Sequence, residues 1–154
     1  MSTPPKKKKK LTPEEFMDAA RKEFGYLMTE FGFEEDADRR KALGPRSICF
    51  VSPVAAVTVE GIQITMNVQV TVTCMAPEGE EPARVSLSAI VAERAPQARE
   101  AAEDMLALLA RDAGLLRQHA ADFLRGQANA LAEARRIAEQ QARKNANKNA
   151  QGVS

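Results

Sequence analysis

The sequence predicts an α+β fold with an N-terminal helix, a four-stranded antiparallel meander sheet and C-terminal helices. Three observations support this prediction. A capped helical stripe opens the folded part, alternating apolar and polar residues fill the middle, and helical spacing returns from Pro96 onward. Every predicted helix and strand has one apolar side, so we expect two layers, with the main helices on one face of the sheet.

The first helix is predicted over residues 12–31. Thr12 is a favoured N-cap, Pro13 suits the first helical position, and Glu15 completes a capping box. Apolar residues then recur at helical spacing and form a single stripe. Gly32 follows as a left-handed stop. The connection that comes next is expected to be a loop over residues 33–46, with at most one helical turn.

Four strands are predicted in the middle of the chain, at residues 47–52, 54–59, 62–74 and 84–91. In the third, apolar and polar side chains alternate without exception over 13 residues, a pattern that a helix cannot produce. Glu60-Gly61 is expected to form the tight turn before it. Because the connections are too short for parallel crossovers, the strands should pair antiparallel.

Residues 97–125 return to helical spacing and end at Gly126. Whether they form one helix or two stays open, since Asp112-Ala113-Gly114 interrupts the stripe. Residues 127–145 are good helix formers with few large apolar groups, which predicts a weakly anchored helix.

The domain organisation follows from these patterns. Residues 11–126 are expected to form a single domain, since 154 residues suit one domain better than two. Residues 1–10, which are rich in lysine, and residues 146–154 are expected to be disordered tails, because they offer little apolar surface to bury.

The net charge of +1 conceals a strong segregation along the chain. Residues 1–11 carry +5, residues 12–134 carry −8, and residues 135–154 carry +4. An acidic body does not favour nucleic-acid binding, because a phosphate backbone requires a basic surface on the folded part. The tails remain possible contacts with polyanions, chiefly through Lys6, Lys7, Lys8, Lys9 and Lys10.

The two cysteines, Cys49 and Cys74, both fall in predicted strands and are interpreted as buried free thiols of a reducing compartment. The lysine run is not followed by the apolar segment of a signal peptide, and no window approaches the length of a membrane span. The sequence therefore predicts a cytoplasmic protein with no membrane partner.

Three features together resemble a group of small, uncharacterised bacterial α+β proteins. They are Phe31-Gly32-Phe33 at the end of the first helix, the block of alternating strands, and the late stretch His119-Ala120-Ala121-Asp122-Phe123-Leu124-Arg125-Gly126. The resemblance covers roughly residues 14–126, and its motifs are structural rather than catalytic. The group has no established activity. Some small α+β proteins of this size act as immunity or accessory factors bound to a partner, and that comparison is an analogy of fold.

Residues for catalysis or cofactor binding are scarce. His119 is the single histidine, the cysteines lack zinc-knuckle spacing, and no phosphate-binding or nucleophile-elbow motif occurs. A nucleophilic pair between His119 and Cys49 or Cys74 would require an exposed thiol in an electropositive pocket. His119 is interpreted instead as a residue at the core boundary that bonds a carbonyl or Asp122. We therefore predict no enzymatic activity, no cofactor and no metal.

Clusters of carboxylates are interpreted as solvated charge. Glu14/Glu15 and Glu103/Asp104 are neighbours in sequence, and adjacent helical positions do not face one another. Glu34-Glu35-Asp36-x-Asp38 resembles a cation loop but lacks its glycine and its final glutamate.

One predicted surface indicates a function. The outward side of the predicted sheet is nearly free of charge, whereas exposed sheets usually carry Lys and Glu to discourage association. The simpler alternative is that threonine is a good strand former that faces water. We call this surface the polar sheet face, and its residues are Thr58, Gln63, Thr65, Asn67, Gln69, Thr71, Thr73, Ser86 and Ser88.

The function predicted from sequence is a non-catalytic protein-interaction module, of the adaptor, accessory or immunity type. It would bind a protein partner, or a second copy of itself, through the polar sheet face. The alternative is a nucleic-acid accessory factor that uses its basic tails, and an enzyme of unrecognised type comes third.

Overall fold

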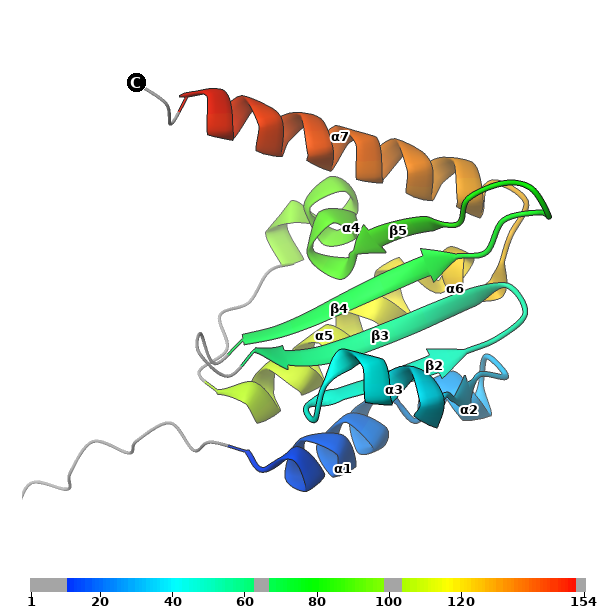
Figure 1. Cartoon of the computed structure of the whole chain (residues 1–154). Coiled ribbons are helices and arrows are strands. Elements are labelled where there is room, and N and C mark those ends of the chain that lie inside the picture. Colours follow the sequence, from blue (N-terminus) through cyan, green and yellow to red (C-terminus); the bar gives the residue numbers. More distant parts are fainter. Residues whose placement is uncertain (1–10, 63–66, 99–103, 152–154) are drawn as a thin grey trace, which may run out of the picture.

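The computed structural model describes residues 11–62, 67–98 and 104–151 (Figure 1). It has an α+β fold with helices packed against a five-stranded antiparallel sheet of order β1-β2-β3-β4-β5. The strands are β1 (Glu34–Glu35), β2 (Ser47–Val51), β3 (Ala55–Ile62), β4 (Asn67–Cys74) and β5 (Ala83–Ser86). The helices are α1 (Pro13–Phe24), α2 (Tyr26–Thr29), α3 (Ala37–Leu43), α4 (Leu87–Arg94), the 3₁₀ turn η1 (Pro96–Ala98), α5 (Met105–His119), α6 (Ala121–Arg125) and α7 (Ala130–Gln151).

The N-terminal helix begins as the capping box predicts. The Glu15 N–H donates to the Thr12 hydroxyl at 3.1 Å, and the Thr12 N–H donates to the Glu15 carboxylate at 3.2 Å. The helical region is divided at Gly25 into α1 and α2, and the left-handed residue predicted after it is Gly32, with φ of +73°.

The central hairpin differs from the prediction at its turn. β3 and β4 pair in full, from Ala55 opposite Cys74 to Ile62 opposite Asn67. Glu60-Gly61 is therefore inside β3, and its assignment as a turn was wrong. A Cβ on Gly61 would lie 2.9 Å from the Phe16 ring, so the glycine permits a close approach of α1 to the strand. Residues 62–74, predicted as one strand, are divided between two. Ile62 ends β3 and Asn67–Cys74 form β4, whereas residues 63–66 lie outside the described residues.

The last strand is shorter than predicted. β5 ends at Ser86, whose hydroxyl accepts the Ala89 N–H at 3.2 Å and caps α4. The predicted strand over 84–91 is therefore wrong beyond Ser86. In α4, Leu87, Ile90 and Val91 are all buried at helical spacing, whereas a strand would have placed Ile90 opposite to the other two.

The connection expected as a loop over residues 33–46 contains two elements. Glu34 and Glu35 form β1, which pairs with Val51 and Phe50 of β2 and was not predicted. α3 then begins beside Asp36, whose carboxylate accepts the Arg39 N–H at 3.1 Å. This connection supplies the fifth strand of the sheet.

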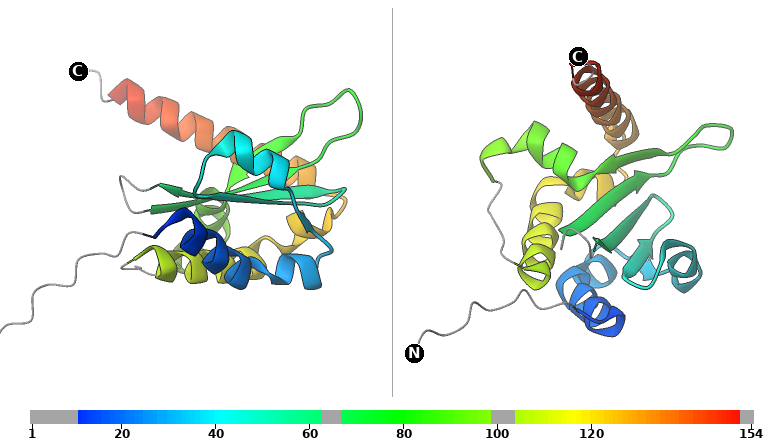
Figure 2. Two further views of the ribbon diagram at one scale, coloured as in Figure 1. Left: turned by 60° about the horizontal axis from the view of Figure 1, so that its bottom comes forward. Right: turned by 60° about the vertical axis from the view of Figure 1, so that its left-hand side comes forward.

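The helices cover the two sheet faces unequally (Figure 2). α1 and α5 lie together on one face, where α6 also contacts β3 and β4. α3 packs against β2 on the opposite face, so the arrangement is not strictly two-layered. The core lies between the sheet and α1, α5 and α6, and the largest fully buried side chains include Phe16, Phe24, Phe50 and Phe123.

The C-terminal part resolves the question of one helix or two. α5 runs without a break through Asp112-Ala113-Gly114, and the division from α6 falls at Ala120. α7 continues to Gln151, beyond the end expected at residue 145. It is anchored to β5, α4 and α6 through its first turns, where the buried side chains are Ala130, Ala134 and Ile137. None of the described helices has the length and apolar character needed to cross a membrane.

Candidate functional site

The sheet face opposite α1 and α5 is here called the open face. Its β4 side chains are Asn67, Gln69, Thr71 and Thr73, because these alternate with valines that point into the core. α3 packs on this face against β2, and Ser47 and Cys49 are buried there. α7 lies along the β5 side of the sheet (Figure 1). The part left open is therefore the strip over β3, β4 and β5.

The structure brings most of the polar sheet face together but does not expose all of it. Asn67, Gln69 and Ser88 are exposed, and Thr58, Thr71 and Ser86 are half-buried. Thr73 is only 7 % exposed, so it cannot be a contact residue in the described conformation. Ser88 belongs to α4 rather than to the sheet. Gln63 and Thr65 lie outside the described residues.

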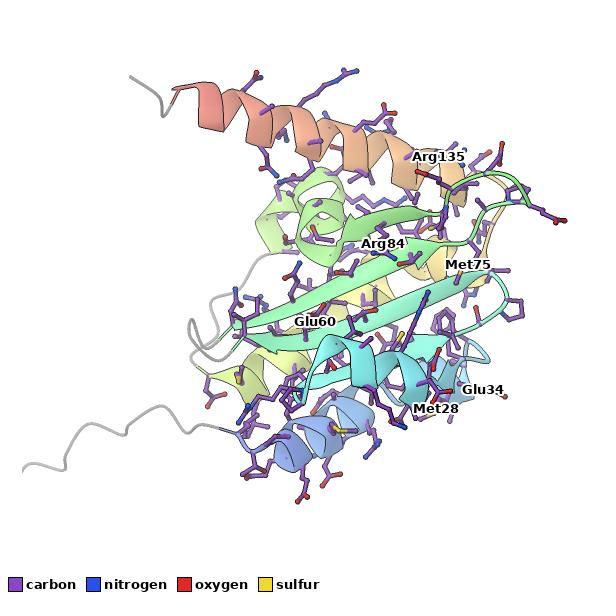
Figure 3. The ribbon with its side chains drawn as sticks, in the orientation of Figure 1. Met28, Glu34, Glu60, Met75, Arg84 and Arg135 are labelled. Carbon is purple, nitrogen blue, oxygen red and sulfur yellow. The ribbon has the colours of Figure 1, made fainter. Side chains whose placement is uncertain are left out.

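The open face is also more charged than the sequence predicted. Glu60, from β3, and Arg84, from β5, both project from it (Figure 3). In the registers of the strands, Glu60 stands opposite Gln69 and Arg84 stands opposite Thr73. Sequence reasoning missed Glu60 because it was assigned to a turn. The strip over β3, β4 and β5 therefore has an uncharged middle, around Thr58 and Thr71, between Glu60 and Arg84.

Beside the open face there is a cavity of about 570 Å³ between β4, α4 and α5. This volume lies within the range of roughly 300–1,000 Å³ that is typical of ligand sites. Four members of the polar sheet face line it: Asn67 and Gln69 of β4, Ser86 at the end of β5, and Ser88 of α4. The full lining is Ile62, Asn67, Val68, Gln69, Val70, Ser86, Leu87, Ser88, Val91, Arg111, Asp112 and Leu115.

The cavity lies where β4 has lost its neighbouring strand. β4 pairs with β3 over all eight of its residues, but its pairing with β5 begins only at Thr71, opposite Ser86. Asn67–Val70 therefore have no strand on their β5 side among the residues that the structure describes. The Val68 N–H donates instead to the side-chain oxygen of Asn67, at 2.8 Å. We call this segment the free edge of β4.

The charges of the cavity are matched within it. The Arg111 Nε donates to the Asp112 carboxylate at 3.1 Å, and the Asp112 side chain is 8 % exposed. The other ten lining residues are uncharged. The cavity thus offers aliphatic side chains, amides and hydroxyls, and it suits a ligand without strong net charge.

The two thiols do not have the surroundings of a nucleophile. Cys49 and Cys74 are both buried and free. Burial, together with the nearby Asp122 carboxylate, raises the pKa of the Cys74 thiol to about 11. Activated cysteines show the opposite shift, toward the thiolate at neutral pH. Cys49 Sγ lies 3.7 Å from the Thr58 hydroxyl, so its contact is with the sheet.

His119 is the last residue of α5. Asp122, one of the partners predicted for its side chain, is paired with Arg94 instead. The His119 backbone carbonyl also accepts a hydrogen bond from Arg94. The His119 Nε2 is a buried atom with no hydrogen-bond partner among the described groups. The expected bond from this side chain to a carbonyl or to Asp122 is therefore not made by Nε2.

The carboxylate clusters are used structurally. Glu35 accepts two hydrogen bonds from Arg21, at 2.9 and 2.7 Å, and Asp36 caps α3. Asp104 caps α5, accepting the Ala107 N–H at 2.8 Å. Within residues 11–62, 67–98 and 104–151, no group of three or more His, Cys, Asp or Glu side chains could hold a metal ion. Lys6–Lys10 and Glu103 lie outside the described residues.

Comparisons with protein-family models, curated proteins and solved structures gave no match to this chain. The resemblance to the group of small bacterial α+β proteins therefore stays a prediction. The case for a function rests on the residues and contacts of this chain alone.

Proposed function

We propose that the protein is a non-catalytic interaction module that binds another protein chain through the open face and the free edge of β4. The binding partner is either a different protein or a second copy of this chain. The observation that carries the proposal is the free edge, Asn67–Val70, which has no strand on its β5 side within the described part of the chain and lies beside a cavity of about 570 Å³.

Unprotected strand edges are uncommon in soluble proteins, because their backbone groups pair readily with other chains. Such edges are usually blunted by lysines, prolines or bulges, or covered by a helix or loop. The free edge of β4 has no lysine or proline, and α4 and α5 flank it but leave the cavity beside it. Its side chains are two uncharged amides, from Asn67 and Gln69, and two valines. An edge left in this condition is expected where pairing with another chain is useful.

The open face supports the same proposal. Its exposed and half-buried side chains around Thr58, Gln69 and Thr71 are hydroxyls and amides, which can be buried against a partner at a lower desolvation cost than charged groups. Interfaces are likewise depleted of charge at their centre. Glu60 and Arg84, at opposite ends of the strip, would then lie at the polar rim.

The test adds charge to the open face. In Gln69→Lys/Thr71→Lys, the new lysine at position 69 stands opposite Glu60, so the substitution should not harm the sheet. The matched control, Gln118→Lys/Gln140→Lys, adds the same charge at exposed positions of α5 and α7. Self-association is measured by sedimentation, and capture of a partner is measured by affinity purification from the native cell.

We expect the wild type and the control to associate alike, and the open-face variant to lose the complex. A protein captured equally well by all three forms is not bound through this face. If all three forms also sediment as monomers and no captured protein distinguishes them, the proposal is wrong.

A further inference from the structure

We infer that the partner is recognised as an extended peptide, which adds a strand to the free edge of β4 and places alternate side chains in the cavity. This inference rests on the proposed function and names the form of the ligand. Three features of the molecule support it: the direction of the β4 backbone groups, the recessed position of the edge, and the chemistry of the cavity lining.

The backbone of β4 has groups available on the cavity side. In a strand, the N–H and C=O groups of successive residues point to opposite neighbours. The Met75 N–H donates to the Val54 carbonyl on the β3 side, so odd-numbered residues of β4 face β3. Val68 and Val70 therefore direct their backbone groups toward the β5 side. There the pairing of Thr71 with Ser86 already directs the Val70 carbonyl at Leu87, and the groups that remain at the cavity are those of Val68 and the Val70 N–H. The bond between the Val68 N–H and the Asn67 side chain is a local substitute that an incoming carbonyl can replace.

The position of the edge, between α4 and α5, favours a single extended segment over a second sheet as the ligand. Asn67–Val70 lie at one wall of the cavity, with Ser88 and Val91 of α4 at another and Leu115 of α5 at a third. A second sheet could not approach an edge enclosed in this way, because its own neighbouring strands would meet α4. A single extended segment, whose strand-to-strand spacing is about 4.8 Å, needs no such room.

The lining specifies the side chains of that segment. An added strand presents successive side chains to opposite faces of the sheet. On the helix side, these would meet the aliphatic groups of Val91 and Leu115, and on the open side they would meet Gln69 and Ser88. Because the Arg111–Asp112 charges are already paired, no charge in the cavity requires a counterpart. The complementary ligand is an extended peptide in which aliphatic and uncharged polar residues alternate.

The experiment uses the full chain and a defined probe. The probe is a short synthetic peptide of alternating Thr and Val, with one terminal Lys at each end for solubility. Its control is the same peptide with N-methyl groups on both edges, which cannot pair as a strand. Binding is followed by amide NMR shifts and by the hydrogen exchange of Val68 and Val70.

Two variants test the place of binding. Ser88→Trp puts a large ring into the cavity from α4 and leaves β4 intact, and Ser88→Ala is its matched control at the same exposed position. We expect the probe to bind wild type and Ser88→Ala with affinities within about twofold of one another, and Ser88→Trp at least tenfold more weakly, about one order of magnitude. At saturation, exchange of the Val70 amide should slow by roughly tenfold or more.

Three results would overturn the inference. They are no binding of the unmethylated peptide up to about 1 mM, equal binding of the methylated control, and shifts confined to amides away from β4 and α4. These results concern the added strand at the free edge, whereas binding through the open face is tested separately by Gln69→Lys/Thr71→Lys. A loss of peptide binding together with an intact open-face complex would mean that docking occurs through side chains rather than through an added strand.

Discussion

Arg94 and Asp122 form a bidentate ion pair that connects α4 to α6. The Arg94 Nη1 donates to Asp122 Oδ1 at 2.7 Å, and Nη2 donates to Oδ2 at 2.9 Å. Nη1 also donates to the His119 carbonyl at 2.7 Å, and the guanidinium lies 4.5 Å from the centre of the Phe123 ring. A single side chain thus holds the turn between α5 and α6 and the wall of the cavity that α4 supplies.

Replacing Arg94 should therefore destabilise the fold. We expect Arg94→Ala to lower the free energy of unfolding by about 2 kcal/mol, because it removes charge-assisted hydrogen bonds to partly buried groups. Arg94→Lys should recover only part of the lost unfolding free energy, since an ammonium group cannot make the bidentate hydrogen bonds of a guanidinium. Denaturation by urea measures both variants. Equal stability of Arg94→Ala and wild type would show that the pair contributes nothing.

The same pair predicts a dependence of stability on pH. The hydrogen bonds from Arg94 lower the pKa of Asp122 below its ordinary value. A carboxylate whose pKa is depressed in the folded state stabilises the fold above its unfolded pKa, about 3.9, and this contribution is lost as the pH falls through the folded pKa. The stability difference between wild type and Asp122→Asn should be largest near neutral pH and should shrink below about pH 4. A difference that is constant from pH 7 to about pH 2 would contradict this.

Two glycines should respond in opposite directions to alanine. A Cβ on Gly61 would lie 2.9 and 3.1 Å from ring carbons of Phe16 and 3.2 Å from the Met105 methyl, so Gly61→Ala should cost about 1–3 kcal/mol by overpacking. Gly114, exposed in α5, has no atom within 4 Å of the corresponding position. Gly114→Ala should stabilise by about 0.5–1 kcal/mol through helix propensity. Thermal unfolding measures both variants, and an unchanged stability of Gly61→Ala would contradict the close contact of α1 with β3.

The first half of α7 should matter to stability and its second half should not. Ile137 is 2 % exposed, and Ile137→Ala is expected to cost about 2–4 kcal/mol. The side chains at 142–147 are exposed, and ending the chain after Gln141 should change the unfolding free energy by less than about 0.5 kcal/mol. A large loss of stability on truncation would mean that the distal half packs on the body.

The thiols should be protected from reagents. Cys49 and Cys74 are buried, and the pKa of Cys74 is raised to about 11, so neither should react at pH 8 at the rate of a free thiol. Labelling by a disulfide reagent should follow the opening of the structure and accelerate in urea. Rapid labelling of one thiol in the native protein would indicate an accessible site.

Local chemistry made parts of this fold predictable. The Thr12–Glu15 capping box fixes where α1 begins, and the alternation of polar residues and valines fixes the faces of β4. The start of α4 was missed because the apolar positions 85, 87, 89 and 91 alternate as they would on a strand. Ile90 distinguishes them: it would face outward on a strand, and it is buried on the helix.

Some residues of the candidate site could be predicted from the sequence, but the cavity itself could not. Asn67, Gln69, Ser86 and Ser88 were singled out for their lack of charge, and all four line the cavity. The cavity itself depends on where β5 stops, and that is set by the Ser86 cap and by the packing of α4 on α5. Arg111 and Asp112 come from a distant part of the chain, so no local pattern placed them there.

The length of α7 beyond its anchor has a practical consequence. From Ile137 to Gln151, a helix rises by about 20 Å, and in Figure 1 this part extends past α4 rather than over the sheet. A tag or a fluorescent protein fused after Gln151 would be carried clear of β4. The end of α7 is therefore a suitable point for attaching the protein to a sensor surface.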